Sequence, residues 1–301
     1  MIQKENTHQT EKKGAGAGRA WFTEFPSAEL LEMHGIEGLD LLQRISTNEL
    51  TKMGIGEWMP TVLTNEKGRM IDLVWVGRIS EDLLFLLAGA HTARKTKEWI
   101  EKFIIMEDVQ ITPPDRRFVH LAVIGETGFP TGIPFIGFEH RWGQVTMRHA
   151  LISEEKRKEE FKLLEERDVE RKSIAEYENF RILTGIPLGK NEISEMFNPL
   201  EAGLDDLVSW TKGCYVGQEV IARLDTYKKV QKRLVRLELA RSVDAVPTPI
   251  RSAGGEAGML TSVIIQEPYR GLGYVGTKQL ETGVDLFVDG KSGQIRVIVK
   301  E

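Results

Sequence analysis

The spacing of apolar side chains predicts a mixture of helices and strands over the first third of the chain. Helical spacing occurs over residues 27–34 and again over 39–45. Continuous or alternating apolar runs over 61–64, 70–76 and 83–88 predict strands, which turn-forming residues separate. Helical spacing returns over 92–103, and a short extended segment follows at 109–112. The pattern predicts an antiparallel meander flanked by helices.

The middle of the chain alternates between apolar runs and polar segments. Residues 119–124 and 144–152 are predicted strands, whereas 125–138 are rich in glycine and proline and are predicted to form a loop. Residues 153–172 carry eight acidic and seven basic side chains, which is typical of a solvated helix with ion pairs between successive turns. An amphipathic helix is predicted over 174–183.

The end of the chain consists of short apolar runs that proline and glycine interrupt. Strands are predicted over 234–239, 258–265, 273–275, 285–288 and 294–299. Such a series predicts a small β-domain, either closed or a sandwich. Residues 271–276 fit the G-x-G-x-x-G spacing of dinucleotide-binding loops, but the long helix that such a loop requires does not follow. We therefore interpret this motif as a strand and its turn.

These changes of pattern divide the chain into four parts. Residues 1–20 are polar and glycine-rich and are predicted to form a flexible tail, because they hold too little apolar surface to offset the entropy of ordering. Residues 21–114 and 115–229 are predicted to form two α+β modules, and residues 230–301 the small β-domain. The fold class is therefore α+β with a C-terminal β-domain.

Composition and charge narrow the classes of function. Hydrophobic residues make up 41% and charged residues 28% of the 301-residue chain, and a net charge of −5 argues against a protein that coats nucleic acid. No segment approaches the roughly 20 apolar residues of a membrane span, and no apolar signal segment begins the chain. We therefore expect a cytoplasmic protein without a membrane partner. The six histidines are not paired at metal-binding spacing, so no metal site is expected.

The one cysteine, Cys214, lies in the unusual segment Lys212-Gly213-Cys214-Tyr215-Val216-Gly217-Gln218-Glu219. Two glycines and a lysine surround the thiol, and helical spacing begins just after it. A nearby cation and a helix N-terminus both favour a thiolate, and glycines permit close approach of a ligand. The segment fits either a reactive thiol or a structural thiol buried in a tight turn. A single cysteine excludes an internal disulfide.

This segment resembles the Lys-Gly-Cys-Tyr-x-Gly-Gln-Glu signature of the YgfZ family, folate-binding proteins related to the glycine-cleavage T-protein, an aminomethyltransferase. Further segments are similar to parts of these proteins: 42–50, 63–72, 180–187, 198–204 and 272–275. The similarity covers about residues 25–112 and 174–301. It implies a T-protein-like fold, in which two α+β modules surround a folate-binding hole and a small C-terminal β-barrel follows.

The resemblance implies tetrahydrofolate, a reduced folate, as the cofactor. Asp72 occupies the position of a T-protein aspartate near the reactive nitrogens of folate, where a carboxylate orients N5 and N10 or moves a proton. The alternative interpretation is that Asp72 is an exposed carboxylate on a strand, without a functional role. Catalytic roles are expected for Cys214, Lys212 and Asp72. Contacts to the cofactor are expected from Asn48, Asp72, Glu178, Arg181, Gly213, Tyr215, Gln218 and Glu219.

Some of these residues have a structural alternative. Glu178 and Arg181 lie three residues apart, hence on one helix face. There they fit either the pterin edge and glutamate tail of folate or a local ion pair. Asn48 fits either a ligand contact or a cap of the preceding helix.

Three functions are compatible with these residues. The signature favours a YgfZ-type protein that supports assembly or repair of iron–sulfur enzymes, with cluster proteins, assembly factors and tRNA-modifying enzymes as partners. The chain itself has too few cysteines to hold a cluster. Asp72 is compatible with a second function, that of a folate-dependent one-carbon (aminomethyl) transferase. The sequence therefore does not decide whether the chain is an enzyme. A basic run from Lys228 to Arg236 fits a non-catalytic RNA-modification partner, or else a solvated strand edge.

Overall fold

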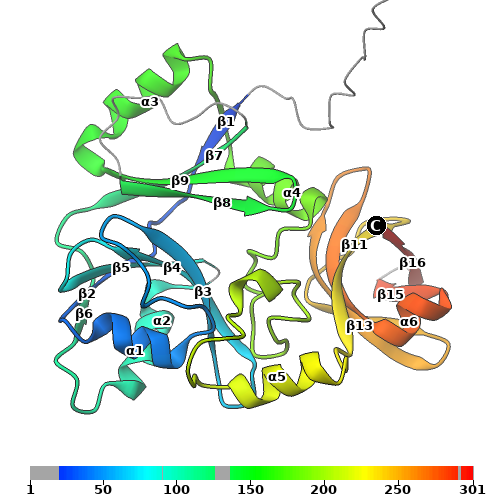
Figure 1. Cartoon of the computed structure of the whole chain (residues 1–301). Helices are drawn as coiled ribbons and strands as arrows, with labels where there is room; N and C mark the ends of the chain where they lie inside the picture. Colours follow the sequence, from blue (N-terminus) through cyan, green and yellow to red (C-terminus); the bar gives the residue numbers. More distant parts are fainter. Residues whose placement is uncertain (1–19, 90, 126–135, 291–292, 301) are drawn as a thin grey trace, which may run out of the picture. The chain divides into compact units, whose positions relative to one another are not determined.

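The computed structural model describes residues 20–89, 91–125, 136–290 and 293–300 (Figure 1). The predicted tail lies outside these residues except for its last position. The described residues form two compact units, of which the first combines those up to Pro26 with those between 118 and 173, and the second combines those between 27 and 117 with those after 173. The four-part division of the sequence stays a prediction. Among the described residues, no helix has both the length and the apolar character needed to cross a membrane.

The first unit is built on a five-stranded sheet in the order β10-β1-β7-β9-β8. Its elements are β1 (Trp21–Glu24), β7 (Phe118–Ile124), β8 (Ile136–Trp142), β9 (Val145–Ser153), η2 (Glu154–Lys156), α3 (Arg157–Glu166) and β10 (Glu170–Lys172). β1 is parallel to β10 and antiparallel to β7. Phe161 and Leu164 of α3 pack into an apolar core with residues of β1, β7 and β9. The N-terminal strand is therefore an inner strand of this sheet.

Two predictions for this unit need correction. The loop predicted over 125–138 ends early, because β8 starts at Ile136 and pairs with β9 along its whole length. The glycines and prolines before β8, together with Gly137 within it, obscure the alternation of apolar and polar residues in this strand. Residues 126–135 lie outside the described part. The charged helix predicted over 153–172 is confirmed over α3, but its end forms β10, since pairing with β1 outweighs the local preference.

The second unit begins with an antiparallel sheet in the order β3-β4-β5-β2-β6. Its elements are β2 (Leu30–His34), α1 (Gly38–Ile45), β3 (Trp58–Thr64), β4 (Met70–Arg78), β5 (Leu83–Ala88), α2 (Ala93–Ile100), η1 (Glu101–Phe103) and β6 (Gln110–Thr112). The predicted meander and the helices after residues 38 and 92 are confirmed. The helix predicted over 27–34 is wrong, because pairing with β5 and β6 makes this short segment a strand.

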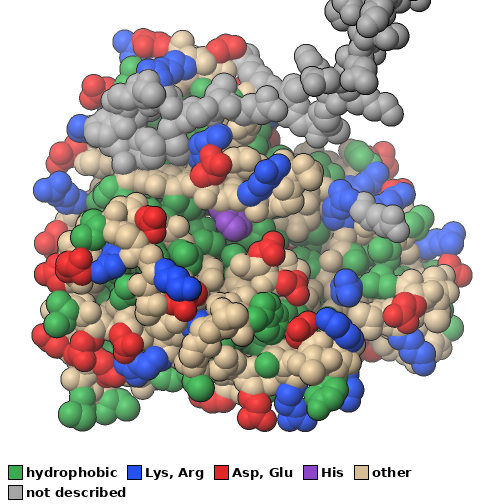
Figure 2. Space-filling model, in the orientation of Figure 1, with side chains coloured by type: hydrophobic (Ala, Val, Ile, Leu, Met, Phe, Trp, Pro, Cys, Tyr) green, Lys and Arg blue, Asp and Glu red, His purple; other side chains and the backbone are tan. Residues whose placement is uncertain are grey.

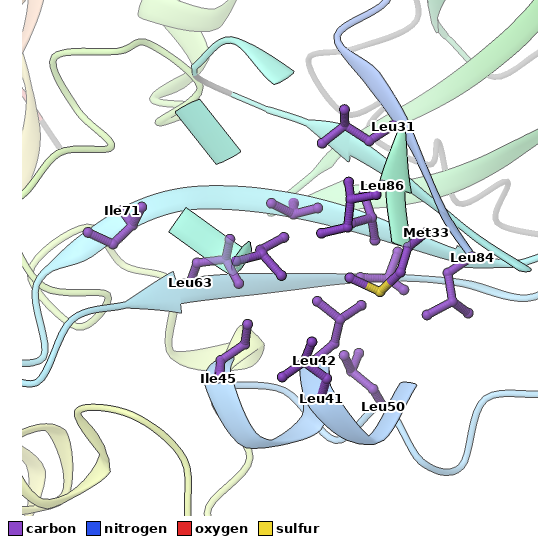
Figure 3. Close-up of a cluster of buried hydrophobic side chains, with 14 of the residues drawn as sticks. Leu31, Met33, Leu41, Leu42, Ile45, Leu50, Leu63, Ile71, Leu84 and Leu86 are labelled. Carbon is purple, nitrogen blue, oxygen red and sulfur yellow. The ribbon is translucent and has the colours of Figure 1, made fainter. Parts of the chain in front are cut away.

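Apolar side chains of α1 and the sheet form the core of this module. Leu41, Leu42 and Ile45 point from α1 toward Leu63 and Leu86 of the sheet (Figure 3), and each of the five is at most 2% exposed. Burial of such a side chain contributes about 1.5–3 kcal/mol. The core thereby fixes the end of α1, where several predicted site residues lie.

The rest of the second unit leads through α4 (Ile174–Thr184), η3 (Asp205–Leu207) and α5 (Gln218–Thr226) into a closed barrel. The barrel order is β11-β14-β13-β12-β15-β16. Its elements are β11 (Lys232–Leu239), β12 (Thr248–Ser252), β13 (Gly255–Ile264), β14 (Arg270–Gly276), α6 (Thr277–Thr282), β15 (Leu286–Gly290) and β16 (Gly293–Lys300). The predicted β-domain is confirmed, and the G-x-G-x-x-G motif lies in β14. β12, which contains Pro249, was not predicted.

Candidate functional site

A buried lysine fastens the Lys-Gly-Cys segment to the end of α1. The Nζ of Lys212 donates hydrogen bonds to the carbonyl of Ser46 at 2.8 Å and to that of Asn48 at 2.5 Å. It also lies 5.3 Å from the ring centroid of Tyr215. Burial lowers the pKa of the Lys212 ammonium to about 8, while the Glu49 carboxylate acts in the opposite direction. The structure thus brings Lys212, Asn48 and Tyr215 together, with Lys212 as a donor to the backbone.

Close glycine packing joins the same segment to the β3–β4 turn. Gly217 has a φ of 84° and is the N-cap of α5. A Cβ atom there would lie 2.5 Å from the carbonyl oxygen of Asn65 and 2.9 Å from the Cα of Gly68. The Thr64 hydroxyl donates to the carbonyl of Val216 at 2.6 Å. Only glycine fits at position 217, so the second glycine of the signature has a packing role.

The thiol lies on the exposed side of the segment. Cys214 and Gly213 are both exposed, so the alternative of a thiol buried in a turn is wrong. Tyr215 is buried, and burial raises the pKa of its phenol to about 12. Gln218 is half-buried, whereas the Glu219 side chain is 87% exposed and pairs with an arginine one turn later at 3.8 Å. The segment therefore presents Cys214 to solvent while its lysine and tyrosine are buried.

Asp72 is a fully buried carboxylate in β4, not the exposed strand residue of the alternative interpretation. One of its oxygens accepts a hydrogen bond from the Thr96 hydroxyl of α2 at 2.6 Å, and the other accepts one from the N–H of Leu73 at 2.8 Å. Sequence reasoning missed Thr96. The available signal was a polar residue on the inner face of α2, one turn after the N-cap Thr92. These bonds orient the carboxylate within the fold.

Asn48 fastens the loop after α1 to β3. Its side-chain amide donates to the carbonyl of Pro60 at 2.9 Å, and its own N–H donates to the Thr61 hydroxyl at 2.9 Å. Its side-chain oxygen accepts a hydrogen bond from the N–H of Glu49 at 2.9 Å. These bonds shape the loop that receives Lys212, and they join it to β3 rather than capping α1.

Glu178 and Arg181 form the ion pair of the structural alternative, within a larger buried network. Arg181 of α4 pairs with Glu178 at 2.7 Å and with Glu192 at 3.1 Å, and it donates to the Ser262 hydroxyl of β13 at 2.9 Å. The Ser262 hydroxyl donates to Glu192 at 2.8 Å. The side chain of Glu192 is 0% exposed and that of Glu178 is 45% exposed. Glu192, which sequence reasoning missed, joins α4 to the barrel, and Glu178 is the accessible member.

The predicted residues therefore meet in separate groups within the second unit. The Lys212 group lies at the end of α1, the Arg181 group on α4, and Asp72 between β4 and α2. Two cavities of about 650 and 660 Å³ adjoin α6 and the barrel, and none of the expected catalytic or folate-contacting residues lines either of them, although Lys228 and Arg233 of the basic run do. Within the described ranges, no three His, Cys, Asp or Glu side chains are grouped to hold a metal ion.

Comparison with family models and curated proteins relates this chain to transferases. Residues 20–127 match the GCVT N-terminal domain. A putative chloroplastic transferase of Arabidopsis thaliana is 40% identical over 124 residues, which cover 40% of this chain and 28% of that protein. An aminomethyltransferase of Synechocystis is 26% identical over 88% of this chain and 80% of its own length. One from Aquifex aeolicus is 29% identical over 66% of this chain and 58% of its own length.

Comparison with solved structures identifies the fold. The glycine cleavage system aminomethyltransferase T of Bartonella henselae matches with a TM-score of 0.73 and 20% identity, covering 94% of this chain and 85% of that one. The predicted T-protein-like α+β fold with a C-terminal barrel is thereby confirmed. The comparisons support a relationship to the T-protein, whereas the narrower YgfZ assignment stays a prediction.

Proposed function

We propose that the chain binds a reduced folate and acts in one-carbon (aminomethyl) transfer. The observation that carries this proposal is Asp72, a buried and oriented carboxylate within the segment that matches the GCVT N-terminal domain. At 0% exposure this carboxylate acts on a bound folate by holding β4 and Thr96 of α2 in place, which positions the residues around the ligand. The aminomethyltransferases that align with 88% and 66% of the chain support the same reaction class.

The test is calorimetric titration of the full chain with tetrahydrofolate. Wild type is expected to show saturable binding. Asp72→Asn is expected to weaken it at least about tenfold, because the charged acceptor that holds Thr96 in place is lost. Asp40→Asn is the matched control, since Asp40 has a side chain that is 67% exposed. The absence of saturable binding by wild type would overturn the proposal, and unchanged binding by Asp72→Asn would remove Asp72 from it.

A second candidate function rests on the exposed thiol beside a buried lysine. We propose that Cys214 serves a YgfZ-type role, in which the folate-binding protein supports assembly or repair of iron–sulfur enzymes together with cluster proteins or assembly factors. Cys214→Ser is expected to abolish support of an iron–sulfur enzyme in a strain that lacks this protein, while tetrahydrofolate binding is retained. Full support by the serine variant would contradict this role.

A link to tRNA-modifying enzymes depends on the basic run. Lys228 is 83% exposed, but Lys232 lies over the ring of Phe197 at 5.8 Å, so the run does not form one continuous exposed stripe. Figure 2 shows basic and acidic side chains interspersed over the visible face. These observations therefore favour the first two functions over an RNA partner. A salt-independent affinity for tRNA would count against it, because phosphate contacts release counterions.

A further inference from the structure

We propose that the mouth of the C-terminal barrel binds a small amphipathic carboxylate, with an apolar chain or ring seated in the barrel and its carboxylate at the rim. The site is a cavity of about 660 Å³ between α6, the start of β15, and the ends of β11 and β16. Ligand cavities are typically about 300–1,000 Å³ and occur at the mouths of β-barrels. No residue of the proposed folate site lines it, so the two proposals are independent.

The inner wall of this cavity is part of the barrel core. Its apolar lining residues Val235, Leu280, Leu286, Val297 and Val299 all belong to the barrel's hydrophobic cluster or pack against it. Leu286 and Val297 are each 4% exposed. A ligand with an apolar body extends this core and removes apolar surface from water, which is favourable. The wall therefore selects for an apolar chain or ring.

The rim of the cavity is cationic. Arg233, Arg296 and Lys300 line it against a single carboxylate, that of Asp285. Arg296 is engaged by Asp285 at 2.9 Å, and Lys300 by Glu238 at 2.9 Å. No hydrogen bond or salt bridge joins the Arg233 side chain to another described residue, and the Asp205 carboxylate interacts with it only at longer range. Its guanidinium is thus available to an anion.

The charge pattern favours a carboxylate over a cation. A guanidinium binds a carboxylate through two parallel hydrogen bonds, which match its planar geometry. Arg233 also lines the neighbouring cavity of about 650 Å³, whose acidic residues include Asp205, Asp225 and Glu281. An anion is therefore repelled from that side and attracted to the barrel mouth, where the cations outnumber the acids.

The test uses octanoate as the probe, titrated below micelle-forming concentration into the full-length protein and followed by calorimetry. Octanoate is expected to bind saturably and at least about tenfold more tightly than octylammonium, which has the same chain and the opposite charge. Acetate, which lacks the chain, is expected to show no saturation. Equal binding of octanoate and octylammonium, or no saturable binding of octanoate, would overturn the proposal.

Two variants locate the site. Arg233→Gln is expected to weaken octanoate binding about tenfold or more, whereas Arg251→Gln, a barrel arginine outside the cavity that pairs with Asp289, is expected to leave it unchanged. Val284→Trp fills the cavity from a side chain that is 43% exposed, so it is expected to abolish binding without unfolding the barrel. Unchanged binding by both cavity variants would overturn the assignment. Tetrahydrofolate titration is expected to be the same for all of them.

Discussion

Among single side chains, Lys212 shows how a signature residue can be structural. A lysine beside a thiol suggests activation of that thiol, yet the ammonium of Lys212 donates to two backbone carbonyls at the end of α1. Lysine is rarely buried unless its charge is compensated. Here two carbonyl dipoles and the nearby Tyr215 ring supply that compensation. Lys212 therefore holds the exposed Cys214 at a fixed position relative to α1.

Replacement of Lys212 by methionine is expected to lower the free energy of unfolding by about 1–3 kcal/mol, because two carbonyls lose their donor. The measurement is urea unfolding followed by tryptophan fluorescence. Lys228→Met is the control, since the Lys228 side chain is 83% exposed, and its effect is expected to stay within about 0.5 kcal/mol. Equal effects of the two variants would show that the bonds of Lys212 contribute nothing.

At the level of elements, the start of α5 is determined by its contact with the β3–β4 turn. Gly217→Ala is expected to destabilise the protein by about 1–3 kcal/mol, because φ is positive and the added Cβ would lie 2.5 Å from a carbonyl oxygen. Gly213→Ala, where no atom lies within 4 Å of the added Cβ, is the matched control within the same signature. Thermal unfolding of both variants measures the difference, and similar melting temperatures would refute the packing role.

The joint between α4 and the barrel depends on a buried ion pair. Glu192→Ala leaves the Arg181 guanidinium, whose side chain is 4% exposed, without its buried partner, and is expected to cost about 3–5 kcal/mol. Glu178→Ala removes the half-exposed partner of the same arginine and is expected to cost less than about 1 kcal/mol. Chemical unfolding of the two variants gives the comparison. A larger loss of unfolding free energy in Glu178→Ala than in Glu192→Ala would contradict this prediction.

For the whole molecule, acid should destabilise the first unit through two stacked histidines. His120 and His149 lie between Phe25 and Phe138, and their ring nitrogens are 2.9 Å apart. Burial lowers the pKa of His120 to about 3, and burial followed by the charges of His120 and His140 lowers the pKa of His149 well below its usual range. The unfolded chain therefore binds these protons first as pH falls.

The stability of this unit is expected to be constant above about pH 6.5, the ordinary histidine pKa, and to fall between pH 6.5 and 3. Each histidine contributes up to about 1.4 kcal/mol per pH unit in that window. Hydrogen exchange at pH 7 and pH 5, corrected for the intrinsic exchange rate at each pH, measures the effect, and protection is expected to fall more in β7 and β9 than in β3 to β5. The control is His34→Gln, at an exposed histidine, which is expected to leave the pH dependence of protection in β7 and β9 unchanged. An equal loss of protection in all these strands would contradict the prediction.

The sequence predicts most of this fold where local pattern decides the structure. β5 follows from a continuous apolar run and α1 from helical spacing, and tertiary contacts reinforce both local preferences. β2 could not be predicted, because its partners β5 and β6 lie about 50 and 80 residues away and override a short ambiguous segment. The same holds for the site: the sequence indicates Asp72, but its partner Thr96 and the network of Glu192 depend on contacts between distant segments.

The inner position of β1 has a consequence for the order of synthesis. This strand is made before both of its neighbours, β7 and β10, which follow only after roughly 100 and 150 residues. At about 5–20 residues per second, the nascent strand waits roughly 5 to 30 s for them on the ribosome. Trp21 and Phe22, which are buried in the finished sheet, are exposed throughout that interval. Translation speed between residues 25 and 172 therefore sets how long this apolar strand is open to chaperones.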